Sequence, residues 1–292
     1  MDDYTRRTRD WLEGIYEGAP GVPYVPHSPV FGFNPLSRYI GTYCHLFAVM
    51  REIAPYEVGS CLEVGCGEGF LSSLIRRLFG ARVAGVDLSH RVCGRAADYC
   101  NLPCAVSEAT ALPFRDGSFD LVVSINTLEH IADLAGAYAE LRRVSRGLVV
   151  VGMPHASRPG EEESADEPHA HVSLPTRAEM RAIFGPRARI RGSLSRMARP
   201  LYALAARDDI STRPGYERLG RGLGRAVYAL TRRAAATFDA RRTLAWLCRL
   251  EDRWSRRWSG LTYESIIVSE VAPPRRASRG LSDEAILSEL LR

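Results

Sequence analysis

Residues 60–69 have the sequence Ser-Cys-Leu-Glu-Val-Gly-Cys-Gly-Glu-Gly. The apolar run at 61–64 predicts a short buried strand, and the pattern that begins at Phe70 predicts a helix. Glycines at alternate positions between them predict a tight turn whose bare backbone can touch a ligand. A strand, a glycine turn and a helix start form the first βα unit of a nucleotide-binding sheet. The dinucleotide fingerprint would need a glycine at position 70, so Phe70 excludes it.

Strand and helix patterns alternate along the chain after this turn. The predicted strands are 61–64, 82–86, 104–107, 120–125 and 147–152, and the predicted helices are 4–17, 36–54, 70–79, 89–100 and 133–145. This alternation predicts an α/β fold with a doubly wound, mostly parallel sheet and helices on both faces. Right-handed crossovers place the carboxyl ends of parallel strands at one edge, where we expect the ligand.

Four motifs in this order and spacing resemble those of the class I S-adenosylmethionine-dependent methyltransferases, in the branch that acts on small molecules such as quinones. Glu63 completes motif I as E-x-G-x-G-x-G, and Asp87 ends the second strand with a carboxylate. The other matching segments are Glu108-Ala-Thr-Ala-Leu-Pro-Phe114 with Asp116-Gly-Ser-Phe-Asp120, and the strand 121–125 with Asn126-Thr-Leu-Glu-His-Ile131. The resemblance covers about residues 40–155. It implies a Rossmann-like seven-stranded sheet, completed by a helix at 176–184, a strand at 188–194 and a last, antiparallel strand at 263–270.

The resemblance implies that S-adenosylmethionine is the cofactor. Glu63 and the glycine turn would hold its methionine part, Asp87 its ribose hydroxyls and Leu88 its adenine ring. Glu108 stands where the family usually has aspartate, and its longer carboxylate would still accept the adenine amino group. The predicted cofactor residues are Glu63, Gly65, Cys66, Gly67, Gly69, Asp87, Leu88, Glu108, Ala109 and Asn126.

His130 and its neighbour Glu129 are the predicted catalytic groups. Methyl transfer from a sulfonium is a direct displacement, so alignment contributes most, and a hydroxyl acceptor also needs a base. His130 follows the fourth strand at the ligand edge, although a capping or packing role stays an alternative. In the quinone O-methyltransferases this pair and a glutamate three residues earlier can hold a divalent ion, but that earlier position is Asn126 here. We therefore predict no metal site.

Two loops supply candidate acceptor residues. The Pro/Gly-rich segment 18–29 and the residues after it predict an aromatic lid, with a strap packed on the sheet edge as an equal alternative. The polar segment 153–175 is long enough to be functional. The candidates from the two loops are Tyr24, His27, Phe31, His155 and His171.

An arginine-rich segment separates the sixth and last predicted strands. The net charge is +5, but residues 177–260 hold 20 Arg against 7 Asp and Glu. Residues 196–260 predict a helical insert that borders the acceptor entrance, with two apolar stripes: Leu219, Leu223, Val227, Leu230 and Phe238, then Trp246, Leu247, Leu250, Trp254 and Trp258. A solvated lid or dimer surface, an amphipathic surface on anionic membrane and nucleic-acid binding stay open, in that order of preference.

Cysteine spacing and hydropathy argue against a disulfide-rich, zinc-binding or membrane-spanning protein. The seven cysteines include no C-x-x-C pair, which argues against a disulfide framework and a zinc site. No apolar run approaches the roughly 20 residues of a membrane span. The start of the chain lacks the apolar core of a signal peptide, so we expect a cytoplasmic protein, with peripheral membrane contact through the insert as an alternative.

These patterns together predict an S-adenosylmethionine-dependent methyltransferase, acting on oxygen of a small-molecule or lipid-like acceptor. An RNA or protein methyltransferase that docks through the basic insert, and a cofactor-binding homologue without catalysis, remain alternatives. The predicted organisation is a lid (1–55), a cofactor-binding domain (56–195 and 261–272), the insert (196–260) and a tail (273–292). Acceptor identity, the methylated atom and oligomeric state stay open.

Overall fold

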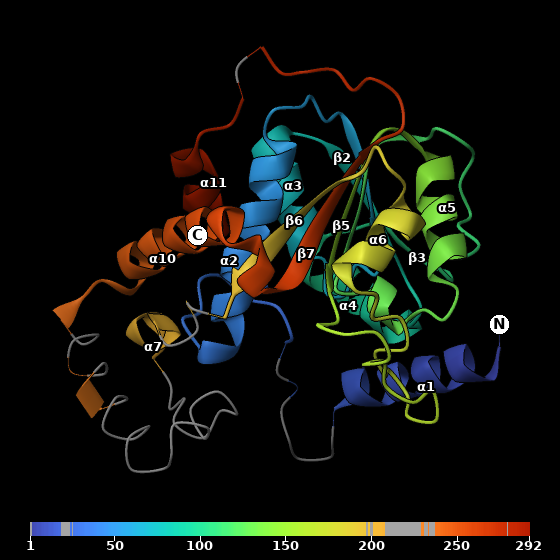
Figure 1. The fold of residues 1–292 in the computed structure, drawn as a ribbon, viewed down its shortest axis with the longest axis horizontal. Helices are drawn as coiled ribbons and strands as arrows, with labels where there is room; N and C mark the ends of the chain where they lie inside the picture. Colours follow the sequence, from blue (N-terminus) through green and yellow to red (C-terminus); the bar gives the residue numbers. More distant parts are fainter. Residues whose placement is uncertain are drawn as a thin grey trace.

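The computed structural model describes residues 2–18, 24, 26–196, 198, 201–207, 229–230, 233, 237–278 and 280–292. Its centre is a seven-stranded sheet with the order β3-β2-β1-β4-β5-β7-β6 (Figure 1). The strands are β1 (Ser60–Val64), β2 (Arg82–Asp87), β3 (Cys104–Val106), β4 (Phe119–Ile125), β5 (Ser145–Pro154), β6 (Arg189–Ser195) and β7 (Thr262–Glu270). β7 is antiparallel to β5 and β6, and the pairs among β1–β5 are parallel. The predicted seven-stranded, mostly parallel sheet is confirmed.

Helices cover both faces of this sheet. They are α1 (Asp3–Glu17), α2 (Ser37–Ile53), α3 (Phe70–Phe79), α4 (His90–Cys100), α5 (Leu134–Val144), α6 (Arg177–Phe184), α7 (Tyr202–Ala205), α10 (Ala240–Arg257) and α11 (Asp283–Leu290). Figure 1 shows α5 and α6 on one side of the sheet and α2, α3, α10 and α11 on the other. β1 is buried along its whole length, as expected for a parallel strand covered on both faces, and its apolar residues Cys61, Leu62 and Val64 point to both sides of the sheet.

The described part of the predicted insert consists of α7, α10 and a short 3-10 turn, η3 (Ser259–Leu261). α10 packs against α2 and β6 through one face, whose buried residues are Leu244, Leu247, Cys248, Glu251, Asp252 and Ser255. The prediction that Trp246 and Trp258 belong to the packed apolar stripe is therefore wrong, since these side chains are 49% and 42% exposed. Leu219, Leu223 and Val227 of the first stripe lie outside the described residues, and Leu230 and Phe238 are exposed. No helix in the described ranges has the length and apolarity needed to cross a membrane.

Polar residues in the buried face of α10 explain why its orientation differs from the prediction. The Asp252 carboxylate is fully buried, and it lies 2.9 Å from guanidinium nitrogens of Arg191 and Arg256 and also pairs with Arg51. Burial alone would raise the pKa of Asp252, but these arginines lower it below its ordinary value. Glu52 of α2 pairs with Arg191 at 2.7 Å and with Arg256 at 2.8 Å. A buried carboxylate needs such partners, so this cluster fixes which face of α10 turns inward.

Replacing Asp252 with alanine should destabilise the fold strongly, because it leaves the nearly buried Arg191 without one of its two carboxylates. Removing one partner of a buried ion pair costs about 3–5 kcal/mol. Urea unfolding followed by circular dichroism measures the loss. Glu284→Ala is the matched control, because its pair with Arg249 is exposed and such pairs contribute about 0–1 kcal/mol. Equal stability of the two variants would contradict a structural role for the cluster.

Candidate functional site

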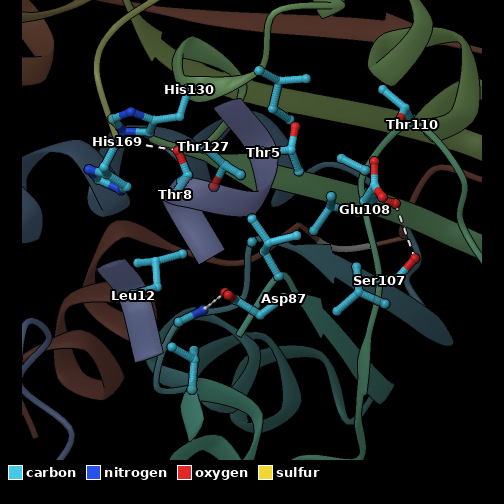
Figure 2. A pocket seen from close by; sticks show the side chains of 18 of the residues that line it. Thr5, Thr8, Leu12, Asp87, Ser107, Glu108, Thr110, Thr127, His130 and His169 are labelled. Carbon is cyan, nitrogen blue, oxygen red and sulfur yellow. Dashed lines mark hydrogen bonds between the residues drawn. The ribbon is translucent and has the colours of Figure 1, made fainter. Parts of the chain in front are cut away.

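A cavity of about 430 Å³ lies at the carboxyl edge of the sheet. The glycine turn after β1, the end of β2, the loop after β3 and the segment after β4 line it, and α1 covers it. Figure 2 shows Thr5, Thr8 and Leu12 of α1 on one side, with Asp87 and Glu108 across from them. The predicted residues that line the cavity are Gly65, Gly67, Asp87, Leu88, Glu108, Ala109, Asn126 and His130.

The glycine turn has a backbone that only glycine adopts without strain. Gly65, Gly67 and Gly69 have φ angles of 73°, 49° and 84°, in the left-handed region. A Cβ atom at Gly65 would collide with the Thr127 side chain, whereas a Cβ at Gly67 would meet nothing within 4 Å. Gly69 is the residue before the first turn of α3. The turn therefore brings bare backbone amides to the cavity wall.

Asp87 ties this turn to the end of β2. Its carboxylate accepts hydrogen bonds from the Gly67 amide at 3.0 Å and from the Ser89 amide at 3.2 Å. Burial raises the pKa of Asp87, and the amides that donate to it lower the pKa in turn. Each carboxylate oxygen can accept two hydrogen bonds, so Asp87 keeps capacity for a ligand's hydroxyl groups.

Three predicted cofactor residues, Glu63, Cys66 and Gly69, do not line the cavity. The buried Glu63 carboxylate accepts bonds from the amide and hydroxyl of Ser72, at 2.9 and 2.6 Å. Burial raises the pKa of Glu63 to about 8. Glu63 thus holds the first turn of α3, where backbone amides have no partner within the helix. The Cys66 thiol points away from the cavity wall, to Cys104 at 3.3 Å, and Gly69 likewise does not line the cavity.

Glu68, within the same motif, anchors the strap that follows α1. It is 1% exposed and accepts bonds from the amides of His27 and Ser28, both at 2.9 Å, and from the Tyr24 hydroxyl. Tyr24 and His27 therefore face the glycine turn from outside and do not line the cavity. Phe31 is 75% exposed and packs edge-on against Tyr99. The sequence analysis did not assign Glu68, since a glutamate inside a glycine turn is expected to be solvated.

α1 forms the cover of the cavity. Thr5, Thr8, Leu12 and Tyr16 line it at helical spacing, and the sequence analysis predicted this helix without assigning any of its residues to the site. The cover is attached on both sides of the cavity. On one side Tyr4 donates to the Ala170 carbonyl at 2.9 Å and Thr8 accepts from the His169 amide at 3.1 Å. On the other side Arg95 of α4 donates to the Tyr16 carbonyl at 3.0 Å.

His130 ends a 3-10 turn, η1 (Leu128–His130), and faces the cavity beside His169 (Figure 2). Its Nδ1 lies 3.1 Å from the Ala170 carbonyl oxygen, which can only accept, so Nδ1 carries the hydrogen and Nε2 keeps its lone pair. The His169 ring stacks on it with the ring centroids 3.7 Å apart. Burial lowers the pKa of His130 to about 4. His130 is therefore neutral at neutral pH, with a basic nitrogen of fixed orientation.

Glu129 lies beside His130, with Oε1 3.9 Å from His130 Nε2. It is 2% exposed and its Oε2 has no hydrogen-bond partner. Burial, together with the nearby carboxylate of Glu264, raises the pKa of Glu129 to about 8. Glu264, which the sequence analysis did not assign, is the third residue of β7 at the same edge and lies 3.0 Å from His45 Nδ1. Within the described part of the chain, these two buried carboxyl groups have histidines beside them but no arginine.

One group of these residues could hold a metal ion. Donor atoms of Glu129, His130 and His171 all lie within 4.8 Å of one another. A carboxylate and two imidazoles suit zinc, manganese or iron, and the bond from Nδ1 to a carbonyl orients His130 as ligating histidines are oriented. The prediction of no metal stays a prediction. His155 is placed elsewhere, with its Nδ1 3.0 Å from the Ser265 hydroxyl, and does not line the cavity.

Residues 62–151 match the family described as "Methyltransferase domain". Among curated proteins, the malonyl-[acyl-carrier protein] O-methyltransferase of Geobacter sulfurreducens is 41% identical over 93 residues, which are 30% of this chain and 35% of that protein. The 2-methyl-6-phytyl-1,4-hydroquinone methyltransferase of Synechocystis is 38% identical over 96 residues, 31% of this chain and 30% of that protein. The chain thus matches about a third of the length of these relatives.

Solved structures resemble the chain over nearly its whole length. The geranyl diphosphate C-methyltransferase of Streptomyces coelicolor, solved with S-adenosyl-L-homocysteine, covers 93% of this chain with a TM-score of 0.51 and 13% identity, and 99% of its own chain is matched. At this identity the likeness concerns the fold alone.

Proposed function

Because the chain contains a class I S-adenosylmethionine-dependent methyltransferase domain, we propose that it transfers the methyl group of that cofactor to an oxygen of a small-molecule or lipid-like acceptor. One observation carries the proposal: the glycine turn, Asp87, the loop at Glu108 and His130 line a single cavity. The cofactor supplies an activated methyl group on a sulfonium. The protein must bind it, hold an acceptor oxygen in line with it and remove a proton.

The residues present fit the cofactor. The Gly67 backbone, without a side chain, borders the cavity and would face the methionine part. Asp87 keeps acceptor capacity for the ribose hydroxyls. Leu88 and Val92 offer apolar contacts for the adenine ring, and Glu108 with Ala109 would meet its polar edge. Glu63 and Cys66 would act indirectly, by holding the turn in shape.

His130 would act as the base, with the neutral Glu129 beside it. The neutral His130 Nε2 accepts the proton of an acceptor hydroxyl at the cavity wall. With a pKa of about 4, His130 does not retain that proton at neutral pH and releases it to solvent. The carboxyl group of Glu129, with a pKa of about 8, is itself mostly protonated at neutral pH and does not take up the proton. Buried titratable groups with shifted pKa values are common in catalytic sites.

Asp87→Ala should weaken binding of S-adenosylhomocysteine, because the ligand loses a charged hydrogen-bond acceptor and the turn loses its bond to β2. The cost should be about 1.5–3 kcal/mol, roughly a ten- to hundredfold higher dissociation constant. Isothermal titration calorimetry measures it. Asp116→Ala is the matched control, since this side chain is 82% exposed and outside the cavity. Equal affinity of wild type and Asp87→Ala would overturn the assignment of this cavity.

His130→Gln should lower turnover by about 10²–10⁴-fold while S-adenosylhomocysteine still binds, because the amide has no basic nitrogen. Release of S-adenosylhomocysteine is followed with a panel of hydroquinones, catechols and extracted lipids as acceptors. His90→Gln, an exposed histidine at the start of α4, is the control. Unchanged turnover in His130→Gln would show that His130 is not the base and that alignment of the acceptor with the methyl group is sufficient for the reaction. Binding of the cofactor without methylation of any acceptor, RNA and protein included, would favour a non-catalytic role.

The exposed face of α10 supports a second proposal, peripheral contact with an anionic membrane that holds a lipid-like acceptor. Arg242, Trp246, Arg253 and Arg257 share that face and are exposed. Arginine attracts anionic lipid headgroups and tryptophan prefers the interfacial region.

Vesicles of phosphatidylglycerol should therefore bind the protein, and vesicles of phosphatidylcholine should not. Arg253→Glu should weaken binding about tenfold or more, because each charge near the surface contributes about 1 kcal/mol. Cosedimentation measures this binding, with Glu284→Ala on the exposed end of α11 as the control. Equal binding to both vesicle types, or binding to RNA instead, would refute the membrane assignment.

A further inference from the structure

Three cysteine thiols meet directly behind the glycine turn. Cys66 belongs to the turn after β1, Cys93 to α4 and Cys104 to the start of β3. The Cys104 sulfur lies 3.3 Å from the Cys66 sulfur and 2.7 Å from the Cys93 sulfur. All seven cysteines lie in the described part of the chain, and each carries a free thiol. Cys104 is thus in contact with two possible disulfide partners from two different elements.

Gly85 in the middle of β2 makes this contact possible. Gly85 pairs with Cys104 of β3 across the sheet. A Cβ atom at position 85 would lie 2.7 Å from the Cys66 sulfur and 2.9 Å from the Cys66 Cβ. A glycine inside a strand weakens it, but here its missing side chain leaves the space through which the Cys66 thiol reaches across β2 to Cys104.

The same cysteines adjoin the cofactor cavity. Gly65 and Gly67, on either side of Cys66, line the cavity, as does Val92, the neighbour of Cys93. The Gly65 and Cys66 amides both donate to the Val86 carbonyl, at 2.8 and 3.0 Å. A shift of Cys66 toward Cys104 would therefore strain these two bonds and displace the backbone of Gly65 and Gly67 that lines the cavity.

We propose that Cys66, Cys93 and Cys104 form an oxidation site, in which Cys104 forms a disulfide with either neighbour, and that the Cys66–Cys104 disulfide weakens cofactor binding. This inference rests on the proposed function, because the affected ligand is S-adenosylmethionine or its demethylated product. Cys93 and Cys104 have the shortest contact, so their disulfide forms first. The Cys66 sulfur then attacks Cys104, forms the second disulfide and releases Cys93 as a thiol.

Formation of one disulfide consumes one molecule of oxidant, a peroxide. One thiol, as its thiolate, attacks the oxygen–oxygen bond of hydrogen peroxide, giving a sulfenic acid and one water after proton uptake. The second thiol displaces the hydroxyl of the sulfenic acid as a second water and completes the disulfide. Two thiols are oxidised, and one peroxide is reduced to two waters.

The thiols are reduced and slow to react at neutral pH. The contact with Cys104 lowers the pKa of Cys66, but burial and the Asp87 carboxylate raise it, to about 11. The contact with Cys104 and burial also raise the pKa of Cys93. Because the thiolate is the reactive form, oxidation requires sustained exposure to peroxide, and the reduced form is the resting state.

The test compares affinity for S-adenosylhomocysteine in the full chain before oxidation, after exposure to hydrogen peroxide at pH 8.5, and after reduction by dithiothreitol. Peptide mass spectrometry without reduction maps the disulfides. Oxidation should raise the dissociation constant about tenfold or more, with a Cys66–Cys104 disulfide present, and reduction should restore it. Bound S-adenosylhomocysteine should lower the fraction of the Cys66–Cys104 disulfide relative to Cys93–Cys104, because two coupled equilibria affect each other reciprocally.

Cys104→Ala removes the shared partner and should keep its affinity through oxidation. Cys93→Ala leaves the Cys66–Cys104 pair and should lose affinity as the wild type does, which keeps the test valid if Cys104→Ala does not fold. Cys248→Ala is the matched control, because Cys248 contacts Cys44 at 3.8 Å, between α10 and α2, and this variant should respond like the wild type.

Absence of any disulfide at Cys104, or unchanged affinity once Cys66–Cys104 has formed, would overturn the proposal. Failure of the reduced protein to bind S-adenosylhomocysteine would instead contradict the proposed function, so the two failures are distinguishable.

Discussion

The hydrogen bond from the Gly67 amide to the Asp87 carboxylate, at 3.0 Å, joins the two halves of the cofactor cavity. One half is the turn after β1 and the other is the end of β2, which the parallel register Val64↔Val86 places side by side. A buried carboxylate is stable only with hydrogen-bond donors around it, and a turn in the left-handed region exposes amides that need acceptors. The Asp87 carboxylate supplies the acceptor for the Gly67 amide, and the amide supplies a donor for the carboxylate. This hydrogen bond holds the turn in shape without a ligand.

Two other carboxylates near the glycine turn also accept hydrogen bonds from backbone amides. Glu63 accepts from the first turn of α3 and Glu68 accepts from the strap at His27 and Ser28. Three carboxylates therefore satisfy backbone amides from three directions, at the helix start, the strand end and the strap. The loop that contains Glu163 and Ala170 is fixed differently, through α1 and His130. Glu63, Glu68 and Asp87 thus each hold backbone of the glycine turn or of a segment packed against it.

Two further buried acids, Glu129 and Glu264, lie behind His130 on the opposite side of the cavity. Burial raises the pKa of Glu129 to about 8 and that of Glu264 to about 7, and no arginine among the described residues pairs with either carboxyl group. The arginines of this part of the chain are instead paired around Glu52 and Asp252, between α2, β6 and α10. Buried acids kept apart from cations are costly, and such groups cluster where proton transfer or ligand binding occurs. The catalytic proposal for His130 depends on this separation.

The sequence by itself determined the sheet, its strand limits within a few residues and the glycine–Asp87 half of the site, because these follow from local periodicity and from a backbone that only glycine adopts. It did not determine that α1 covers the cavity or that Glu63 and Cys66 point away from it, because sequence spacing does not say which neighbour a side chain meets. The orientation of α10 and the meeting of Glu129, His130 and His171 depend on contacts between distant segments. Only the tertiary structure decided them, since burial, and with it the pKa of each acid and histidine, is a property of the packed chain.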